Sequence, residues 1–495
     1  MNTILLPYAR KSNRYEKYAL HGIHSDSYQG EFGDVPLSLI IMEEKDSSGL
    51  RYDNISFDKF KSLNIKHVYL RDMSKFRNND TAQRLIMNLP DSVTDLSIKP
   101  IGCLFVKCDI YAKSLKRLNF VEGYGFVPTS YKNGWLGCND NRSYEEPPIK
   151  IQVDPENLEE LHIGAMKERL KVGNILKGFK NLRSVHIPYN MIESLDDIPT
   201  DNLEELYLVF GEMGSEKHSR VLMKQCNTKD INEILAINRQ LCQLKKLKSL
   251  KYTVIDEYDD LSELPNLEEL HFDLRYIHDT STDIPITDNI KGLKLKGLCC
   301  SVFNRDVVDE LIREQPNLQY LELHIGYEEE NLDLTALTRL KDLTIYMRES
   351  CCIPKGIKSN SLEIMRVYCY DEAREPITPF KSAHLPRLKA VEINGIKESR
   401  VLDLFRNIHT IKSLSFLEDP LGYNYYVETF QDAWHDWVNN LEHLEIQFNE
   451  KIYKEVVWME KLQRLTLRHA NKDMMENVME SGAPLKICYT NNSFY

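Results

Sequence analysis

The groups in this sequence that most resemble catalytic or metal-binding residues are a few histidines. In "HGIH", His21 and His24 stand three residues apart, but neither a cysteine nor a third ligand lies close by. His435 in "DAWHDW" has two acidic neighbours, a context typical of an exposed insertion. The phosphate-binding, dinucleotide-binding, GxSxG and HExxH motifs are all absent. We therefore expect a protein that is not an enzyme and that needs no cofactor.

The cysteines point to packing and not to metal binding. There are 11, an odd number, spread along the chain, and they include the adjacent pairs Cys299–Cys300 and Cys351–Cys352. No CxxC pair occurs, and structural zinc sites usually contain such pairs. We interpret these residues as reduced cysteines that fill an apolar core in a reducing compartment, and we predict no metal site.

Charge and hydropathy narrow the class of protein further. The net charge is −12, from 63 basic and 75 acidic residues, which argues against broad nucleic-acid binding. No stretch approaches the roughly 20 apolar residues that a membrane span needs. The beginning of the chain, "MNTILLPYARKSNRYEKY", lacks the pattern of a secretory leader. We expect an intracellular protein, cytoplasmic or nuclear, that is not attached to a membrane.

A repeated heptapeptide indicates how the chain is organised. "NLEELHI" at 157–163 returns as "NLEELYL" at 202–208, "NLEELHF" at 266–272 and nearly so as "NLEHLEI" at 440–446. Its relaxed form, apolar-x-x-apolar-x-apolar, occurs 16 times, and 13 of the 15 spacings lie between 20 and 30 residues. The first positions of these matches are Ile65, Val93, Leu115, Leu158, Leu182, Leu203, Leu247, Leu267, Ile290, Leu318, Leu340, Leu362, Leu388, Ile411, Leu441 and Leu462. A fixed period predicts a stacked repeat protein.

Each unit reads as a short strand followed by a return segment. The alternating end of the pattern is that of a strand with one buried face. Segments 229–241, 305–315 and 400–411 have apolar stripes at helical spacing, which predicts amphipathic helices. Parallel strands with helical returns predict a curved α/β solenoid, with a parallel sheet on the concave face and helices and irregular turns on the convex face.

The pattern resembles the leucine-rich-repeat superfamily. The family signature continues with x-x-Asn or x-x-Cys, and Asn190 and Asn449 occupy that position in "LRSVHIPYN" and "LEHLEIQFN". The irregular unit length is most similar to the intracellular repeats of F-box receptors and ribonuclease-inhibitor-like proteins. This resemblance implies a horseshoe-shaped solenoid that recognises other molecules with its concave face.

The repeat pattern also divides the chain. Residues 1–60 carry no clear repeat and are expected to cap the first unit. Residues 61–495 form the predicted solenoid of about 16 or more irregular repeats, with insertions near 121–157 and 211–230. The first insertion is interpreted as a surface loop, and its Trp135 makes it a possible binding loop. The second is interpreted as a mobile loop.

The predicted concave face supplies the candidate binding residues. One cluster spans three successive repeats and consists of Tyr320, Glu322, His324, Tyr346, Arg366 and Tyr368. Tyrosine and arginine are among the residues that most often anchor protein interfaces. Two basic groups are secondary candidates: Lys251 with Lys294 and Lys296, and Arg464 with Arg468 and His469.

Three functions remain open at this stage. The first is a non-catalytic interaction or scaffold protein that recognises a protein partner on the concave face. The second is the substrate-recognition subunit of a ubiquitin ligase, with a degenerate F-box-like amino terminus near Leu6–Pro7 that would bind the ligase adaptor. The third is a scaffold associated with nucleic acid, which would use the basic groups.

Overall fold

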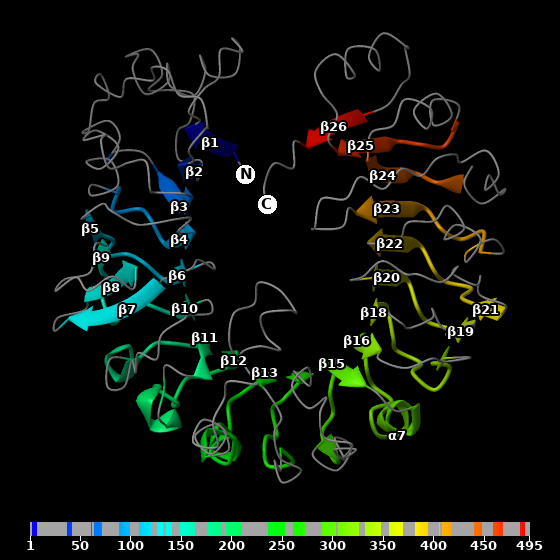
Figure 1. Cartoon of the computed structure of the whole chain (residues 1–495), viewed down its shortest axis with the longest axis horizontal. Helices are drawn as coiled ribbons and strands as arrows, with labels where there is room; N and C mark the ends of the chain where they lie inside the picture. Colours follow the sequence, from blue (N-terminus) through cyan, green and yellow to red (C-terminus); the bar gives the residue numbers. More distant parts are fainter. Residues whose placement is uncertain are drawn as a thin grey trace. The chain divides into compact units, whose positions relative to one another are not determined.

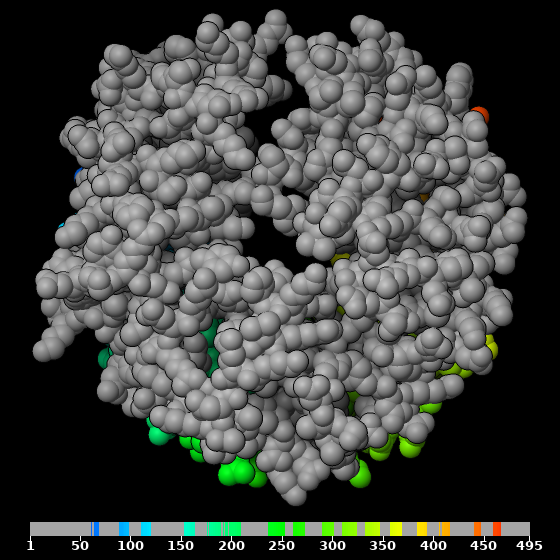
Figure 2. Space-filling view, viewed as in Figure 1, coloured from blue at the N-terminus to red at the C-terminus, as the bar shows by residue number. Residues whose placement is uncertain are grey.

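The structure is a computed structural model of the 495-residue chain. Figure 2 gives a space-filling view, and Figure 1 shows in colour the residues whose placement the structure describes. They are 2–6, 37–41, 61, 64–71, 89–99, 108–120, 126–131, 135–140, 149–163, 176–189, 192, 194–209, 236–252, 261–272, 290–302, 305–325, 332–347, 356–369, 382–394, 405, 408–417, 440–447, 459–468 and 486–490.

Two compact units make up the chain, residues 1–266 and residues 267–495. The predicted division at residue 60 is a different one and stays a prediction. In the first unit, parallel strands follow one another across the sheet in chain order (Figure 1). They are β1 (Asn2–Leu6), β2 (Leu37–Ile41), β3 (Ile65–Arg71), β4 (Asp95–Lys99), β6 (Arg117–Phe120), β10 (Glu160–Ile163), β11 (Ser184–Pro188), β12 (Glu205–Val209) and β13 (Ser249–Tyr252).

The second unit repeats this arrangement with its own parallel strands. They are β14 (Glu269–Phe272), β15 (Gly297–Val302), β16 (Tyr320–Ile325), β18 (Asp342–Met347), β20 (Ile364–Cys369), β22 (Ala390–Asn394), β23 (Ser413–Leu417), β24 (His443–Gln447), β25 (Arg464–Arg468) and β26 (Lys486–Thr490). In both units, the segments that connect successive strands are here called the returns.

The buried positions of the repeat form the core. All 16 first positions of the pattern are buried, none with more than 5% of its surface exposed. The register then places apolar residues of neighbouring strands side by side, as for Leu161, Val185 and Leu206 on β10, β11 and β12. Parallel strands with one apolar column per buried position confirm the predicted solenoid of parallel strands.

One repeat of the second unit begins later than its pattern indicates. The register pairs Leu298 of β15 with Leu270 and with Leu321, which makes Leu295 the first apolar position of this repeat. Ile290 lies five residues earlier, in a turn that contains Gly292 at φ +87°. The prediction of a repeat beginning at Ile290 is therefore wrong, because the apolar residues around it fit two overlapping matches.

A buried glutamine completes the backbone hydrogen bonds of this irregular repeat. Gln315, with 1% of its surface exposed, accepts the N–H of Leu295 at 3.1 Å through Oε1. Its Nε2 donates to the carbonyl of Ile290, also at 3.1 Å. These two hydrogen bonds stabilise the repeat, because a buried backbone group without a hydrogen-bond partner costs about 1–3 kcal/mol of folding free energy.

The asparagine that opens "NLEELHI" has a structural role that the pattern did not reveal. Asn157 Nδ2 donates to the carbonyl of Lys113 at 3.1 Å, in the preceding repeat. The equivalent Asn202 and Asn266 donate to carbonyls of their own preceding repeats, at 3.2 Å and 2.8 Å. Each bond ties one repeat to the next, which explains why the same residue recurs.

We expect Asn202→Ala and Asn266→Ala each to lower the free energy of unfolding by about 0.5–1 kcal/mol, the usual net contribution of one hydrogen bond near the surface. Urea titrations followed by circular dichroism measure the change. The control is Asp201→Ala, next to Asn202 and also exposed, which should leave the midpoint unchanged. Equal shifts in all three variants would contradict a specific role for the asparagine.

The returns contain less regular helix than the sequence predicts. The predicted helix at 305–315 is confirmed as α7 (Arg305–Glu314), which buries Leu311 and Ile312. Of the predicted helix at 229–241, residues 236–238 are helical and 229–235 lie outside the described residues. At 400–411, Phe405, Ile408 and Ile411 are buried, and the remaining residues of the segment before Ile408 lie outside the described set.

Most other described returns are short turns or short strands. The single-turn helices are η3 (Leu176–Gly178), η5 (Leu195–Asp197) and η6 (Leu241–Gln243). In the second unit, β17 (Leu332–Asp333), β19 (Gly356–Lys358) and β21 (Ser382–His384) form a narrow parallel sheet of their own. The predicted mixture of helices and irregular turns is thus observed, with few residues in helix among those described.

The insertion near 121–157 contains a hairpin where the sequence was interpreted as a loop. Strands β7 (Phe126–Tyr131) and β8 (Trp135–Asp140) pair antiparallel, and β8 also pairs with β9 (Ile149–Gln152). Strand β9 in turn pairs with β5 (Cys108–Tyr111). Trp135 therefore begins a strand of this four-stranded sheet, and its side chain is not among the described ones.

The amino-terminal region contributes to the sheet as well. Strands β1 and β2 lie within the predicted cap, so the parallel sheet begins before the first recognisable repeat. The capping role of residues 1–60 stays a prediction, since most of the region lies outside the described residues. The insertion at 211–230 also lies outside them.

Candidate functional site

In each unit, the parallel sheet formed by the repeats has one face that the buried leucines do not occupy, here called the open face. In the second unit, Tyr346 of β18 and Tyr368 of β20 lie side by side on it, because the register pairs these two residues. Their rings stack with centroids 4.8 Å apart and planes inclined by 14°. With Arg366, two residues before Tyr368, they form what we call the tyrosine–arginine patch.

Two carboxylates hold the tyrosine–arginine patch in place. Arg366 donates through Nη1 to Asp342 Oδ1 at 2.5 Å, and its Nε lies 3.5 Å from Glu392 Oε2. The hydrogen bond to Asp342 is the main cause that raises the pKa of Arg366. Tyr368 donates its hydroxyl to the other oxygen of Glu392 at 2.5 Å. Arg366 is thus already paired within the chain, whereas the sequence suggested an arginine available to a partner.

The structure brings together only part of the predicted cluster. Tyr320 is on the same open face, with 51% of its surface exposed, but β18 separates its strand from that of Arg366. Two strand spacings amount to about 10 Å. Glu322 accepts a hydrogen bond from Cys299 Sγ at 3.1 Å. The side chain of His324 lies outside the described set.

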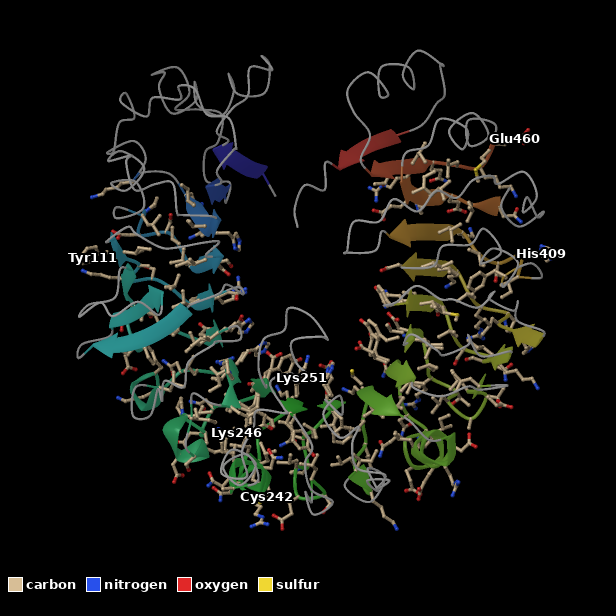
Figure 3. All side chains as sticks on the ribbon, in the orientation of Figure 1. Tyr111, Cys242, Lys246, Lys251, His409 and Glu460 are labelled. Carbon is tan, nitrogen blue, oxygen red and sulfur yellow. The ribbon has the colours of Figure 1, made fainter. Side chains whose placement is uncertain are left out.

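The structure does not bring together the three lysines of the first predicted basic group. Lys251, which Figure 3 labels, lies on β13 in the first unit, and the register pairs it with Tyr207. Lys294 and Lys296 were expected on the concave face, but both precede β15, so this expectation is wrong. Lys296 instead pairs with Glu268, with 2.6 Å between Nζ and Oε1, at the amino-terminal edge of the sheet.

The other basic group is only partly described. Arg464 is exposed and occupies the first outward position of β25, beside His443 of β24. Arg468 ends the same strand, and neither its side chain nor His469 is among the described groups. Whether these residues act together stays a prediction.

The open face of the first unit carries a second cluster that sequence reasoning did not single out. His162 of β10, His186 of β11 and Tyr207 of β12 share one row of the register. The two imidazole rings stack with centroids 3.7 Å apart and planes 5° from parallel. Tyr207 stacks on His186 at 3.9 Å. We call these three residues the histidine–tyrosine stack; the same position in consecutive repeats was the signal that could have found it.

A chain of polar contacts underlies the histidine–tyrosine stack. Ser184 donates its hydroxyl to Glu205 Oε2 at 2.6 Å, and His162 Nε2 lies 3.3 Å from the serine oxygen. Since Ser184 has a single hydroxyl proton, which it gives to Glu205, His162 must donate through Nε2. The shielded Nε2 of His186 lies 3.2 Å from the other oxygen of Glu205. In this arrangement the serine proton goes to a carboxylate and not to a histidine base, so Ser184 is not set up as a nucleophile.

Burial and charge determine the protonation of this cluster. The His186 ring, followed by the hydroxyl of Ser184, outweighs burial and lowers the pKa of Glu205 to about 2. Burial disfavours the charged form of His162, and the neighbouring His186 adds to this, so the pKa of His162 falls to about 4. At neutral pH, Glu205 is therefore ionised and His162 is neutral.

These pKa values predict that the first unit loses stability in mild acid. Between pH 6.5 and about 4, the unfolded chain protonates His162 and the folded chain does not, so protons favour unfolding. We expect the wild type to lose about 1–2 kcal/mol more than His162→Phe between pH 7 and pH 5, after allowing for solvent screening. Below pH 4.5 the unfolded chain also protonates Glu205, whereas the folded chain keeps it ionised to about pH 2, so the free energy of unfolding falls further.

Urea midpoints measured at pH 7 and pH 5 test this prediction. His162→Phe keeps a stacking ring and removes the titrating group, so its midpoint should depend less on pH. The control His384→Phe, at an exposed position on β21, should show the wild-type dependence. A pH dependence that is identical in all three proteins would contradict the assignment of a depressed pKa to His162.

A third polar network lies nearer the amino terminus of the first unit. Asp95 of β4 accepts a hydrogen bond from Arg117 of β6, and His67 Nδ1 lies 3.4 Å from the other carboxylate oxygen. Burial alone would raise the pKa of Asp95, but the bonds from Arg117 and Thr94 outweigh it and lower that pKa. The open face thus carries internally paired charges in both units.

Two kinds of feature are absent from the described ranges, a metal-binding cluster and a membrane-spanning helix. Within them, no three His, Cys, Asp or Glu side chains come together in a way that could hold a metal ion. None of the helices in the described ranges is long and apolar enough to cross a membrane. The predicted location in the cytoplasm or nucleus stays a prediction.

The hypothesis of an F-box-like amino terminus rests on Leu6–Pro7. Leu6 ends strand β1, which pairs with β2 in the sheet, whereas an F-box would continue from this point as a helix. Residues 7–36 lie outside the described set. The described part of this region gives the ligase-adaptor hypothesis no specific support.

Comparisons with known proteins find likenesses at the level of structure. No family model matches the chain, and no curated protein matches it. The structure is similar to a chain of the mouse RP105/MD-1 complex, with 12% identity and a TM-score of 0.30 over 91% of this chain and 74% of that one. It is also similar to a leucine-rich-repeat protein of Leptospira interrogans, with 14% identity and a TM-score of 0.25 over 87% and 92%. At these scores, the fold assignment rests on strand register and burial.

Proposed function

We propose that this leucine-rich-repeat solenoid is a non-catalytic recognition protein that binds a partner protein on the open face of its second unit. The observation that carries the proposal is the tyrosine–arginine patch, in which the ring of Tyr346 stacks on that of Tyr368, and Tyr368 and Arg366 are each hydrogen-bonded to a carboxylate. Rings that are already ordered lose little conformational entropy when a partner covers them, which favours binding.

The chemistry of the patch fits a protein surface. Tyrosine rings supply apolar area with a polar rim, and they are over-represented at interface hot spots. Arg366 and its two carboxylate partners give mixed charge of both signs. A phosphate backbone would meet Asp342 and Glu392 as repulsive neighbours, so the patch favours a protein over a nucleic acid.

Affinity purification with mass spectrometry tests the proposal with three baits. They are the wild type, the double variant Tyr346→Ala/Tyr368→Ala and the control Tyr111→Ala. Tyr111 is 46% exposed but lies on β5, outside the parallel sheet of the first unit. The proposal expects one protein to be recovered with the wild type and the control and lost with the double variant. Identical recoveries with all three baits would contradict it.

A further inference from the structure

A groove lies at the end of the sheet where the parallel strands of the second unit begin. It shares no residue with the tyrosine–arginine patch. Its volume is about 570 Å³, within the range of small-ligand sites. The lining residues precede five successive strands, β20, β22, β23, β24 and β25, and include His409, which Figure 3 labels. They are Glu363, Pro386, Arg387, Lys389, His409, Thr410, Lys412, Asn440, Glu442 and Lys461.

Cations outnumber acids in this groove. Four lysine and arginine side chains face two glutamates, a balance of +4 − 2 = +2 in a chain whose net charge is −12. Both glutamates are already paired: Lys389 with Glu363 at 2.8 Å and Lys412 with Glu442 at 2.5 Å. The surplus charge therefore belongs to Arg387 and Lys461.

These two cations are the ones left for a ligand. Both are exposed, and no described carboxylate lies within 4.0 Å of either. Lys461 Nζ donates to Asn440 Oδ1 at 2.6 Å, which orients the ammonium group without neutralising it. An anion in the groove would thus gain charge pairing without breaking an existing ion pair.

The spacing of the two cations indicates the size of the anion. Arg387 precedes β22 and Lys461 precedes β25, so their repeats are three strand spacings apart, or about 14 Å. A single phosphate or carboxylate would contact both only if the two side chains extended toward each other. An extended peptide advances about 3.3 Å per residue, so two acidic side chains about four residues apart match the separation.

We propose that this groove binds an extended, acidic peptide segment of another protein. Carboxylates of the segment pair with Arg387 and Lys461. The Lys412–Glu442 pair belongs to the two repeats between these cations, and the Lys389–Glu363 pair lines the end of the groove near β20. The groove and the tyrosine–arginine patch use different residues, so either proposal can fail without the other.

Fluorescence anisotropy with the full chain tests this proposal. The probe is a rhodamine-labelled octapeptide of alternating glutamate and serine, in about 50 mM salt so that screening is weak. We expect saturable binding that weakens as salt rises. Binding should weaken at least tenfold with Arg387→Glu/Lys461→Glu, and the same peptide with glutamine in place of glutamate should not bind.

Two controls separate the groove from general charge effects. Arg313→Glu/Lys358→Glu makes the same change of net charge at exposed positions of α7 and β19, and should bind the probe within twofold of wild type. If the glutamate variant does not fold, Arg387→Ala/Lys461→Ala replaces it. Absent binding by wild type, or equal weakening by both double variants, would overturn the proposal. Displacement by millimolar inorganic phosphate, or tighter binding of a thymidine octanucleotide, would overturn it too.

Discussion

Replacing Leu343 by aspartate is expected to unfold the second unit. Leu343 lies at the centre of the sheet on β18, with 0% of its surface exposed, between Leu321 of β16 and Met365 of β20. A carboxylate at this position would lie between these two apolar side chains and away from water. Such a buried charge costs more than about 4–5 kcal/mol, a large share of the 5–15 kcal/mol that stabilises a typical domain.

Circular dichroism and limited proteolysis measure this effect. Leu343→Asp should lose β-sheet signal and expose the second unit to rapid cleavage. The matched control is Tyr320→Asp on the neighbouring β16, where 51% of the residue is exposed, and this variant should remain folded. A Leu343→Asp protein with a wild-type urea midpoint would contradict the assigned register and core.

The second large effect concerns affinity. For the partner identified by affinity purification, we expect Tyr346→Ala/Tyr368→Ala to weaken binding by about 100-fold or more. Truncating one hot-spot residue costs about 2 kcal/mol or more, and each 1.4 kcal/mol is a factor of ten in Kd. The two rings contact each other, so their effects should add incompletely.

Isothermal titration calorimetry with the purified partner measures this change. The control Tyr111→Ala removes an exposed tyrosine from the return strand β5, and its Kd should stay within twofold of wild type. Urea midpoints of all three proteins establish that the variants are folded. Equal Kd values for wild type and the double variant would place the binding surface elsewhere.

The repeat period was sufficient to predict the architecture, because buried positions must recur once per strand. The first apolar positions of the matches are buried throughout, as the pattern requires. The period was not sufficient for register near Ile290, where Leu293, Leu295 and Leu298 are all buried and give overlapping matches. The choice between them depends on a turn at Gly292 and on the side chain of Gln315, which comes from another segment.

The candidate site was harder to predict because its properties depend on pairs across strands. Tyr346 and Tyr368 were both expected on one face, and the register places them in contact. The pairing of Arg366 with Asp342 and Glu392 depends on which residues neighbouring strands place opposite it. The same is true of His162 and His186, whose stacking depends on the register of β10 with β11.

The insertion near 121–157 contains a sequence pattern that is typical of a β-hairpin. Asn133–Gly134 stands between two segments rich in β-forming residues, and Asn-Gly flanked by such segments is a strong hairpin indicator. Strands β7 and β8 lie on either side of this dipeptide. The insertion was interpreted as a surface loop, whereas the position of Asn133–Gly134 between these two segments indicated a hairpin.

The most direct test of partner recognition is site-specific photo-crosslinking in cells. A photoreactive amino acid at position 320 lies on the open face beside the patch strands, and one at position 358 lies on the return strand β19, where Lys358 is also exposed. The account predicts that position 320 captures the protein whose recovery depends on Tyr346 and Tyr368, and that position 358 does not. Capture of that protein at position 358 and not at position 320 would contradict recognition by the open face.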